Sequence, residues 1–149
     1  MTAEQYRTKS WLNRNFGAVQ EIGAVQEKLE QLEAEINRAV KPLGASEIQT
    51  DHNNKAQEIK LAEYSDLKIE LQKKLKKLWA EEAETLRIIN QISEAKHRTI
   101  LILRYINRLQ WCQIWNEMHI AEQTAFKYHI EALDAASPYI PKDWSEEET

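Results

Sequence analysis

The spacing of apolar residues in the first third of the chain constrains the fold more than any other feature. From Ile22 to Val40 the apolar positions follow one another at steps of three and four. This spacing keeps one apolar stripe on one side of an α-helix, as in a coiled coil or a helical hairpin. The 149 residues include only 3 Gly and 3 Pro, and no long alternating run favours a strand. The sequence therefore predicts an all-α protein.

Two long helices are expected in the first part of the chain. The first runs over residues 11–40 and stops at residues 41–44, Lys-Pro-Leu-Gly, because proline lacks an amide donor and glycine permits a turn. Polar residues through Asn54 then form a loop, and the second helix covers residues 55–91. An antiparallel arrangement would form a seam from Leu29, Leu32, Ile36, Leu71, Leu75 and Leu78. We therefore predict a long antiparallel helical hairpin or coiled coil over residues 1–92, which joins two copies in a homodimer.

The sequence changes character at Ser93, which can cap a new helix with Glu94 in its first turn. Three shorter helices are expected, at residues 93–106, about 110–118 and about 122–135, with a tight turn at His119 and Ile120. They would share the core residues Leu101, Tyr105, Leu109, Ile114, Met118, Ile120, Ala125 and Leu133. This pattern predicts a trihelical helix-turn-helix domain over residues 93–136. A loose acidic tail anchored by Trp144 would follow at residues 137–149.

Several classes of protein and site lack their sequence signals. No apolar run approaches the roughly 20 residues of a bilayer span, and the first residues lack the apolar core of a signal peptide. Cys112, His119 and His129 are one ligand short of a closed zinc site. No glycine-rich phosphate loop or nucleophile elbow is present. We expect a soluble cytoplasmic protein without catalytic activity, cofactor, metal or membrane partner.

Short motifs of the second part occur in a recognisable order. They are Leu103-Arg104-Tyr105-Ile106, then Trp111 and Ile114, then Tyr128-His129 with Ala132-Leu133. This segment resembles region four of bacterial sigma factors. With the Lys-Pro-Leu-Gly loop at residues 41–44, nearly the whole chain is similar to a family of small phage and prophage transcriptional regulators, the ArpU and RinA type.

The resemblance implies sequence-specific binding of double-stranded DNA and regulation of phage or prophage genes in a bacterial host cell. RNA polymerase is a second expected partner. The exposed face of the third helix would enter the major groove. Gln123 and Thr124 would contact bases or phosphates, and Lys127 would meet a phosphate or guanine. The other residues assigned to DNA by position are Glu122, Phe126, Ile130, Lys96, Arg98, Arg104 and Arg108.

The charge distribution keeps two other functions open. The chain has a net charge of −4, and Glu122 and Glu131 flank Lys127 in the third helix, so few phosphates would be neutralised. One alternative is a phage DNA-packaging (terminase) small subunit, although its DNA-binding domain usually comes first in the chain. The other is a protein-interaction module that has lost DNA binding and docks on polymerase or a host protein.

Overall fold

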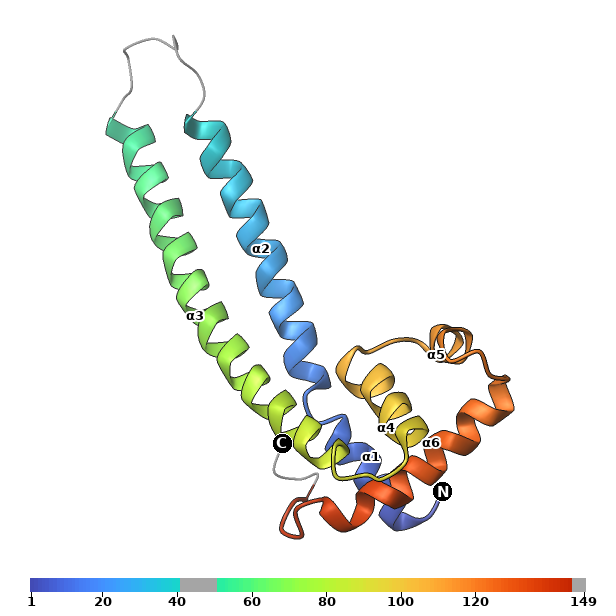
Figure 1. Ribbon diagram of the computed structural model, residues 1–149. Coiled ribbons are helices and arrows are strands. Elements are labelled where there is room, and N and C mark those ends of the chain that lie inside the picture. Colours follow the sequence, from blue (N-terminus) through green and yellow to red (C-terminus); the bar gives the residue numbers. More distant parts are fainter. Residues whose placement is uncertain (41–50, 146–149) are drawn as a thin grey trace. The chain divides into compact units, whose positions relative to one another are not determined.

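The computed structural model describes residues 1–40 and 51–145, where helices are the only regular secondary structure, as predicted (Figure 1). The prediction of an all-α chain is confirmed for these residues. The elements, in chain order, are α1 (Ala3–Leu12), α2 (Phe16–Val40), α3 (Asp51–Ile89), α4 (Ala95–Leu101), the π-helical segment η1 (Ile102–Ile106), α5 (Trp111–Glu117), α6 (Glu122–Ala136) and the 3-10 turn η2 (Ser137–Tyr139).

The chain forms two compact units. One, called the helical pair below, covers Gly17–Leu78. The other, the terminal unit, combines Met1–Phe16 with Trp79–Thr149. These units divide the chain at different points from the predicted ranges 1–92 and 93–136, because the first residues fold with the last third of the sequence.

In the helical pair, α2 and α3 run antiparallel and pack side by side along an apolar seam (Figure 1). Leu32 is also buried and Ile36 is half-buried, so every residue predicted for the seam is at least partly buried. Ion pairs of Lys74 with Glu21 and Lys60 with Glu35 lie beside it. The seam consists of Ile22, Leu29, Leu71 and Leu78, with Val19, Val25, Tyr64, Leu67 and Leu75 half-buried against them.

The connection between these helices is only partly described. The predicted stop at residues 41–44 lies outside the described residues. The second helix begins at Asp51, so the prediction that the loop continues through Asn54 is wrong.

The first predicted helix, residues 11–40, is interrupted. Helix α1 ends at Leu12, and the amide of Phe16 donates to the carbonyl of Asn13 across a tight turn, 3.0 Å away. Helix α1 begins with a reciprocal cap, in which the amide of Gln5 donates to Thr2 Oγ1 at 3.2 Å and the amide of Thr2 donates to Gln5 Oε1 at 2.9 Å. The sequence analysis missed this helix because its apolar spacing starts only at Trp11.

Arg14 holds the turn that separates α1 from α2. Its Nη1 donates to the carbonyl of Trp11 and to Thr85 Oγ1, both at 3.0 Å, and its Nη2 donates to the carbonyl of Glu81 at 3.0 Å. The guanidinium lies 3.7 Å from the centre of the Trp11 ring. Burial lowers the pKa of Arg14, while Glu84 and Glu81 oppose that shift. One side chain thus fixes the end of α1 to the last turns of α3.

Helix α6 is central to the terminal unit, where it contacts α1, α4 and α5. Of the predicted core residues, Leu109, Met118 and Ile120 are half-buried against the core and the other five are buried, so this prediction is confirmed. Trp11 and Leu12 of α1 complete the core from the other end of the sequence. The buried members are Trp11, Leu12, Ile88, Ile89, Ile92, Ile100, Leu101, Leu103, Tyr105, Ile114, Ala125, Ala132, Leu133, Ala136 and Ile140.

Two local predictions near the ends of the terminal unit need correction. Ser93 does not cap α4: the cap position is Glu94, in an extended conformation and without a side-chain cap bond. The start of the tail is not loose, because Ile140 is buried and Arg7 donates to the carbonyl of Pro141. Trp144 packs against the core, as predicted. Residues 146–149 lie outside the described part of the tail.

Candidate nucleic-acid interface

A tight turn joins α5 to α6. His119 has a φ of 56°, in the left-handed region that favours glycine. Its amide donates to the carbonyl of Asn116 at 3.2 Å, and the amide of Ile120 donates to the carbonyl of Trp115 at 3.0 Å. These two bonds form a Schellman motif, which satisfies the last carbonyls of α5 and reverses the chain within a few residues. The predicted turn at His119 and Ile120 is therefore present.

Ala121 occupies the N-cap position of α6 in an extended conformation, with φ −73° and ψ 155°. It makes no side-chain cap bond, as expected for an alanine. The first amides of α6 therefore lack the side-chain acceptor that usually caps a helix. The helix ends at Ala136, within one residue of its predicted end.

Helix α6 has one face in the core and one in solvent. The inward face is made of small or apolar residues, and Ala125, Ala132 and Leu133 have no exposed surface. Because alanines leave little distance between helices, α6 lies close to its neighbours. On the outward face, Glu122, Gln123, Phe126 and Lys127 are exposed, and Thr124 and Ile130 are half-buried. The six residues assigned to DNA on this helix therefore share its outward side.

Two of these outward residues, Lys127 and Phe126, lie near other side chains. Lys127 Nζ lies 4.0 Å from Glu131 Oε1, although the lysine side chain is 72% exposed. The ring of Phe126 lies 5.0 Å from the ring of Trp111 and 6.2 Å from that of Trp115, centre to centre. Phe126 therefore helps to attach α6 to α5, and part of its ring is not free for a ligand.

His129 and Tyr105 form a buried hydrogen bond between α6 and η1, with Tyr105 Oη 2.6 Å from His129 Nε2. Burial, together with the positive charges of Lys9 and Arg104, lowers the pKa of His129 to about 4. Burial also raises the pKa of Tyr105. At neutral pH this hydrogen bond therefore joins a neutral tyrosine hydroxyl and an uncharged imidazole. Nε2 is occupied by this bond, so His129 is a packing residue in this structure.

The four basic residues assigned to DNA divide into two pairs. Lys96 and Arg98 lie on α4. Lys96 Nζ is 3.4 Å from Glu94 Oε2 and 4.7 Å from the centre of the Tyr128 ring. Nη1 of Arg98 donates to the carbonyls of Ile92 and Ser93, at 2.7 and 2.8 Å. Arg98 thus holds the connection before α4, and these bonds use part of its capacity to donate to a ligand.

Arg104 and Arg108 lie together at the end of η1. Nη1 of Arg104 donates to the carbonyl of Leu109 at 3.0 Å, and its guanidinium lies 5.0 Å from the centre of the Trp111 ring. Arg108 has a φ of 58°, and its Nη2 lies 3.9 Å from Glu82 Oε1. Burial lowers the pKa of Arg108, and the charge of Glu82 opposes that shift.

These two arginines line a hollow of about 200 Å³, together with Asn13 and Phe16. Sequence reasoning missed Asn13 and Phe16 because it placed both inside one continuous helix. Only the turn at residues 13–15 brings them to the end of η1.

A second contact that the sequence analysis did not find joins α4 to α6. His97 Nε2 lies 3.0 Å from Glu131 Oε2, and the histidine is 8% exposed. The hydrogen bond from His97 lowers the pKa of Glu131, despite a small opposing effect of burial. Nothing in the local sequence indicates this pair, because the two residues are 34 positions apart.

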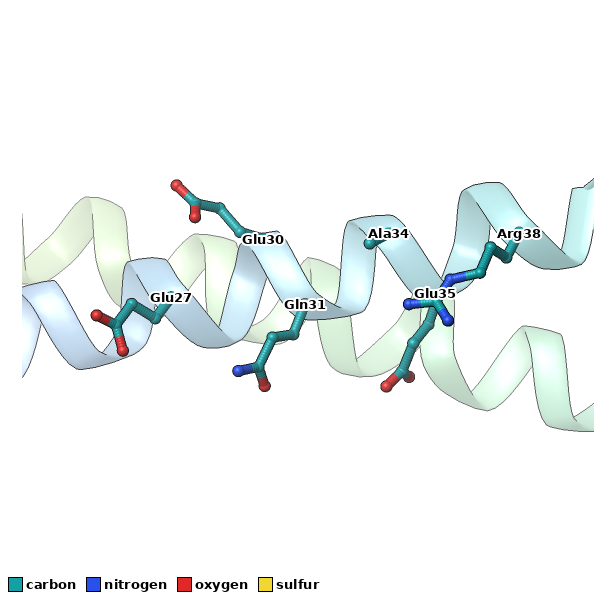
Figure 2. Close-up of a pocket in the computed structure, with 6 residues that line it drawn as sticks. All are labelled: Glu27, Glu30, Gln31, Ala34, Glu35 and Arg38. Carbon is teal, nitrogen blue, oxygen red and sulfur yellow. The ribbon is translucent and has the colours of Figure 1, made fainter.

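A larger hollow of about 420 Å³ lies along α2 in the helical pair (Figure 2). All six residues that line it come from this one helix, and Figure 2 shows Glu30 pointing away from Glu27, Gln31 and Glu35. With three glutamates and one arginine, this surface is unsuited to a nucleic acid. The lining residues are Glu27, Glu30, Gln31, Ala34, Glu35 and Arg38.

Two searches of residues 1–40 and 51–145 gave negative results. No group of three or more His, Cys, Asp or Glu side chains is placed to hold a metal ion in these ranges. None of the described helices has the length and apolar character needed to cross a membrane.

Residues 45–136, which include α3 to α6, match a family model described as Protein of unknown function (DUF1492). The chain belongs to the DUF1492 family. No curated protein matches the chain, and no solved structure matches it. The family match covers the candidate interface of α6 and both pocket arginines.

Proposed function

We propose that this DUF1492 protein binds double-stranded DNA sequence-specifically and regulates transcription of phage or prophage genes. The observation that carries the proposal is the pair α5 and α6, joined by the Schellman turn at His119. In a helix-turn-helix, the second helix lies in the major groove and its N-terminal residues contact base edges. The buried inward face of α6 and its exposed polar residues Glu122, Gln123 and Lys127 suit that role.

The contacts would come from the first two turns of α6. Gln123 is exposed, and a glutamine can pair with both N6 and N7 of adenine. Lys127 lies one turn further along and would reach a guanine or a phosphate. Thr124 lies between them and is half-buried, so its hydroxyl suits a phosphate contact near the start of the helix.

The charges predict modest affinity for one copy. Glu131 lies beside Lys127, and Arg98 donates hydrogen bonds to backbone carbonyls. Few positively charged side chains therefore remain to contact the phosphates of DNA. Binding through two copies would double the contacts and fit a two-fold symmetric site. A homodimer formed through the helical pair would cover apolar side chains of α3, since Ile59, Leu61 and Ile69 are 61%, 47% and 53% exposed. The seam inside the pair is already filled by other residues.

The proposal is tested by a binding selection on random and phage-derived duplexes at low and moderate salt. The test variant is Gln123→Ala/Lys127→Ala. The matched control is Gln72→Ala/Lys77→Ala, which removes the same two side-chain types from the exposed surface of α3. A sequence motif that is enriched by the wild type and the control, and lost in the test variant, supports the proposal. Failure to enrich any duplex even at low salt overturns it.

The hydrogen bonds of Arg98 and Arg104 within the protein favour one second candidate function. It is a protein-interaction module that docks on RNA polymerase or a host protein. Arg98 and Arg104 both donate to backbone carbonyls, as residues with a purely structural role would. Purified polymerase is the discriminating probe. Retention of polymerase by the wild type, with no DNA enrichment, would favour this candidate over the first.

A further inference from the structure

We propose that the hollow lined by Asn13, Phe16, Arg104 and Arg108, called the arginine pocket below, is a phosphate-binding site. In the DNA complex it would receive one backbone phosphate of the duplex. This inference rests on the proposed DNA binding and adds a specific contact to it, outside α6. The chemistry would be the same for a free phosphate ion, so the two sources must be distinguished by experiment.

The pocket has suitable size and composition for a phosphate. Its volume of about 200 Å³ greatly exceeds the roughly 30 Å³ that a water molecule occupies in the liquid, so a tetrahedral anion fits with accompanying water. Two of its four lining residues carry guanidinium groups, whose planar forks match phosphate oxygens in pairs. Phe16 is 53% exposed and offers an apolar wall for a sugar.

Arg104 is held in place before any ligand arrives. Its bond to the carbonyl of Leu109 uses Nη1, and its guanidinium carbon lies 5.0 Å from the centre of the Trp111 ring. An arginine has five N–H donors, so this single bond leaves others for an anion. A side chain that is already ordered loses less conformational entropy when a ligand binds.

Arg108 occupies a backbone position where glycine would be less strained. A non-glycine residue with positive φ is uncommon, and such strain is concentrated at functional sites. The side chain is only 19% exposed, and its ion pair with Glu82 is long, at 3.9 Å. An entering anion would therefore pair with the Arg108 guanidinium, whose positive charge Glu82 compensates only weakly, and it would compete with Glu82 for that charge.

The pocket is linked to the outward face of α6 by direct contacts within the terminal unit. The Arg104 guanidinium lies over the Trp111 ring, and Trp111 in turn packs against Phe126 on α6. Phosphate contacts fix the position of a protein on the duplex, and base contacts read the sequence. A phosphate in the arginine pocket would thus set the register in which Gln123 and Lys127 meet the bases.

The decisive variant is Arg108→Gly. Glycine suits the positive φ, so the fold is retained while the guanidinium is removed. Affinity for the selected duplex is measured against salt for wild type, Arg108→Gly, Arg108→Lys and the control Arg87→Gln, an exposed arginine on α3. Loss of one phosphate contact should lower the slope of log affinity against log salt by about 1 in Arg108→Gly alone. The selected motif should be unchanged.

A second measurement separates this inference from the proposed function. Inorganic phosphate is titrated into isotope-labelled wild type and Arg108→Gly, and the amide resonances of residues 13–16 and 104–109 are followed. If wild type and Arg108→Gly bind the duplex with the same slope of log affinity against log salt, the arginine pocket is not a phosphate-binding site, while the proposal of DNA binding stands. If no duplex binds, saturable shifts that are lost in Arg108→Gly support a site for free phosphate and overturn the DNA source. Absence of both effects overturns the inference entirely.

Discussion

The hydroxyl of Tyr105 lies 2.6 Å from Nε2 of His129, and this buried bond ties η1 to the middle of α6. Burial lowers the pKa of His129 to about 4, so the imidazole is uncharged at neutral pH and a proton taken up at lower pH places a charge in this buried contact. The attachment of the candidate DNA-contacting helix to its core therefore depends on pH.

The first prediction concerns that dependence. Burial holds the pKa of folded His129 at about 4, below its ordinary value of 6.5, so the unfolded chain binds a proton first as the pH falls. The stability that this difference provides is complete above pH 6.5 and is lost as the pH falls from there towards about 4. Urea unfolding at about pH 7.5 and about pH 5 should show a loss of roughly 1–2 kcal/mol from this residue.

The matched variant for this experiment is His129→Gln, which keeps a hydrogen-bonding group but cannot titrate. It will be less stable than the wild type at neutral pH, because the packing around a buried ring is lost. The informative quantity is the change in free energy of unfolding between the two pH values. An equal change in wild type and His129→Gln would contradict the assignment.

The turn between α5 and α6 gives the second prediction. Glycine at position 119 adopts the observed φ of 56° without the steric cost that histidine incurs. His119→Gly should therefore raise the free energy of unfolding by about 0.5–1 kcal/mol, measured by urea denaturation. Glu117→Gly, at the exposed last residue of α5, should change stability in the opposite direction. A loss of stability in His119→Gly would show that the imidazole makes a contact of its own.

The third prediction concerns Arg14. Arg14→Ala removes three hydrogen bonds and the contact with the Trp11 ring, and should cost about 2–3 kcal/mol of stability. Arg14→Lys keeps the charge but not the planar fork, so most of the loss should remain. Arg87→Ala, an exposed arginine on the same helix as Glu81, should change stability by less than about 0.5 kcal/mol. Full recovery in Arg14→Lys would mean that charge alone matters.

The close approach of α5 and α6 gives the fourth prediction. Ala125 has no exposed surface, so Ala125→Leu must displace neighbouring side chains at a cost of about 1–3 kcal/mol. Because α5 and α6 would move apart, the binding selection should enrich the DNA motif less strongly, even though no outward side chain has changed. Ala83→Leu on the exposed surface of α3 is the control and should affect neither property. Normal stability in Ala125→Leu would argue that the helices are loosely packed.

Local patterns accounted for much of this fold. The apolar spacing located the seam residues Leu29, Leu71 and Leu78, and it gave both ends of α6 to within one residue. Such patterns succeed because one buried stripe has the period of the helix that carries it. The outward residues of α6 followed from the same pattern, since they are the positions left outside the stripe.

Other features were beyond local patterns. The break after Leu12 was missed because Trp11, Leu12 and Phe16 continue the apolar spacing, and only Arg14, bonded to Thr85, shows why the chain turns there. The arginine pocket depends on residues 13–16 meeting residues 104–108, and no periodicity encodes that meeting. The carbonyl partners of Arg98 and Arg104 were also beyond local patterns, because they are set by the tertiary structure.

The capped helix α1 has a consequence for synthesis on the ribosome. Gln5 Nε2 donates to Asp134 at 2.8 Å, across 129 positions of sequence. Helix α1 therefore emerges before α6, and its contacts with α6 can form only after α6 has been translated. The helical pair lies between them in sequence, and its contacts span less of the chain, as in the ion pair of Lys74 with Glu21 across 53 positions, so it is ready to fold earlier. A nascent chain that stalls before α6 would leave uncovered the surface of α1 that α6 contacts, where chaperones and proteases act.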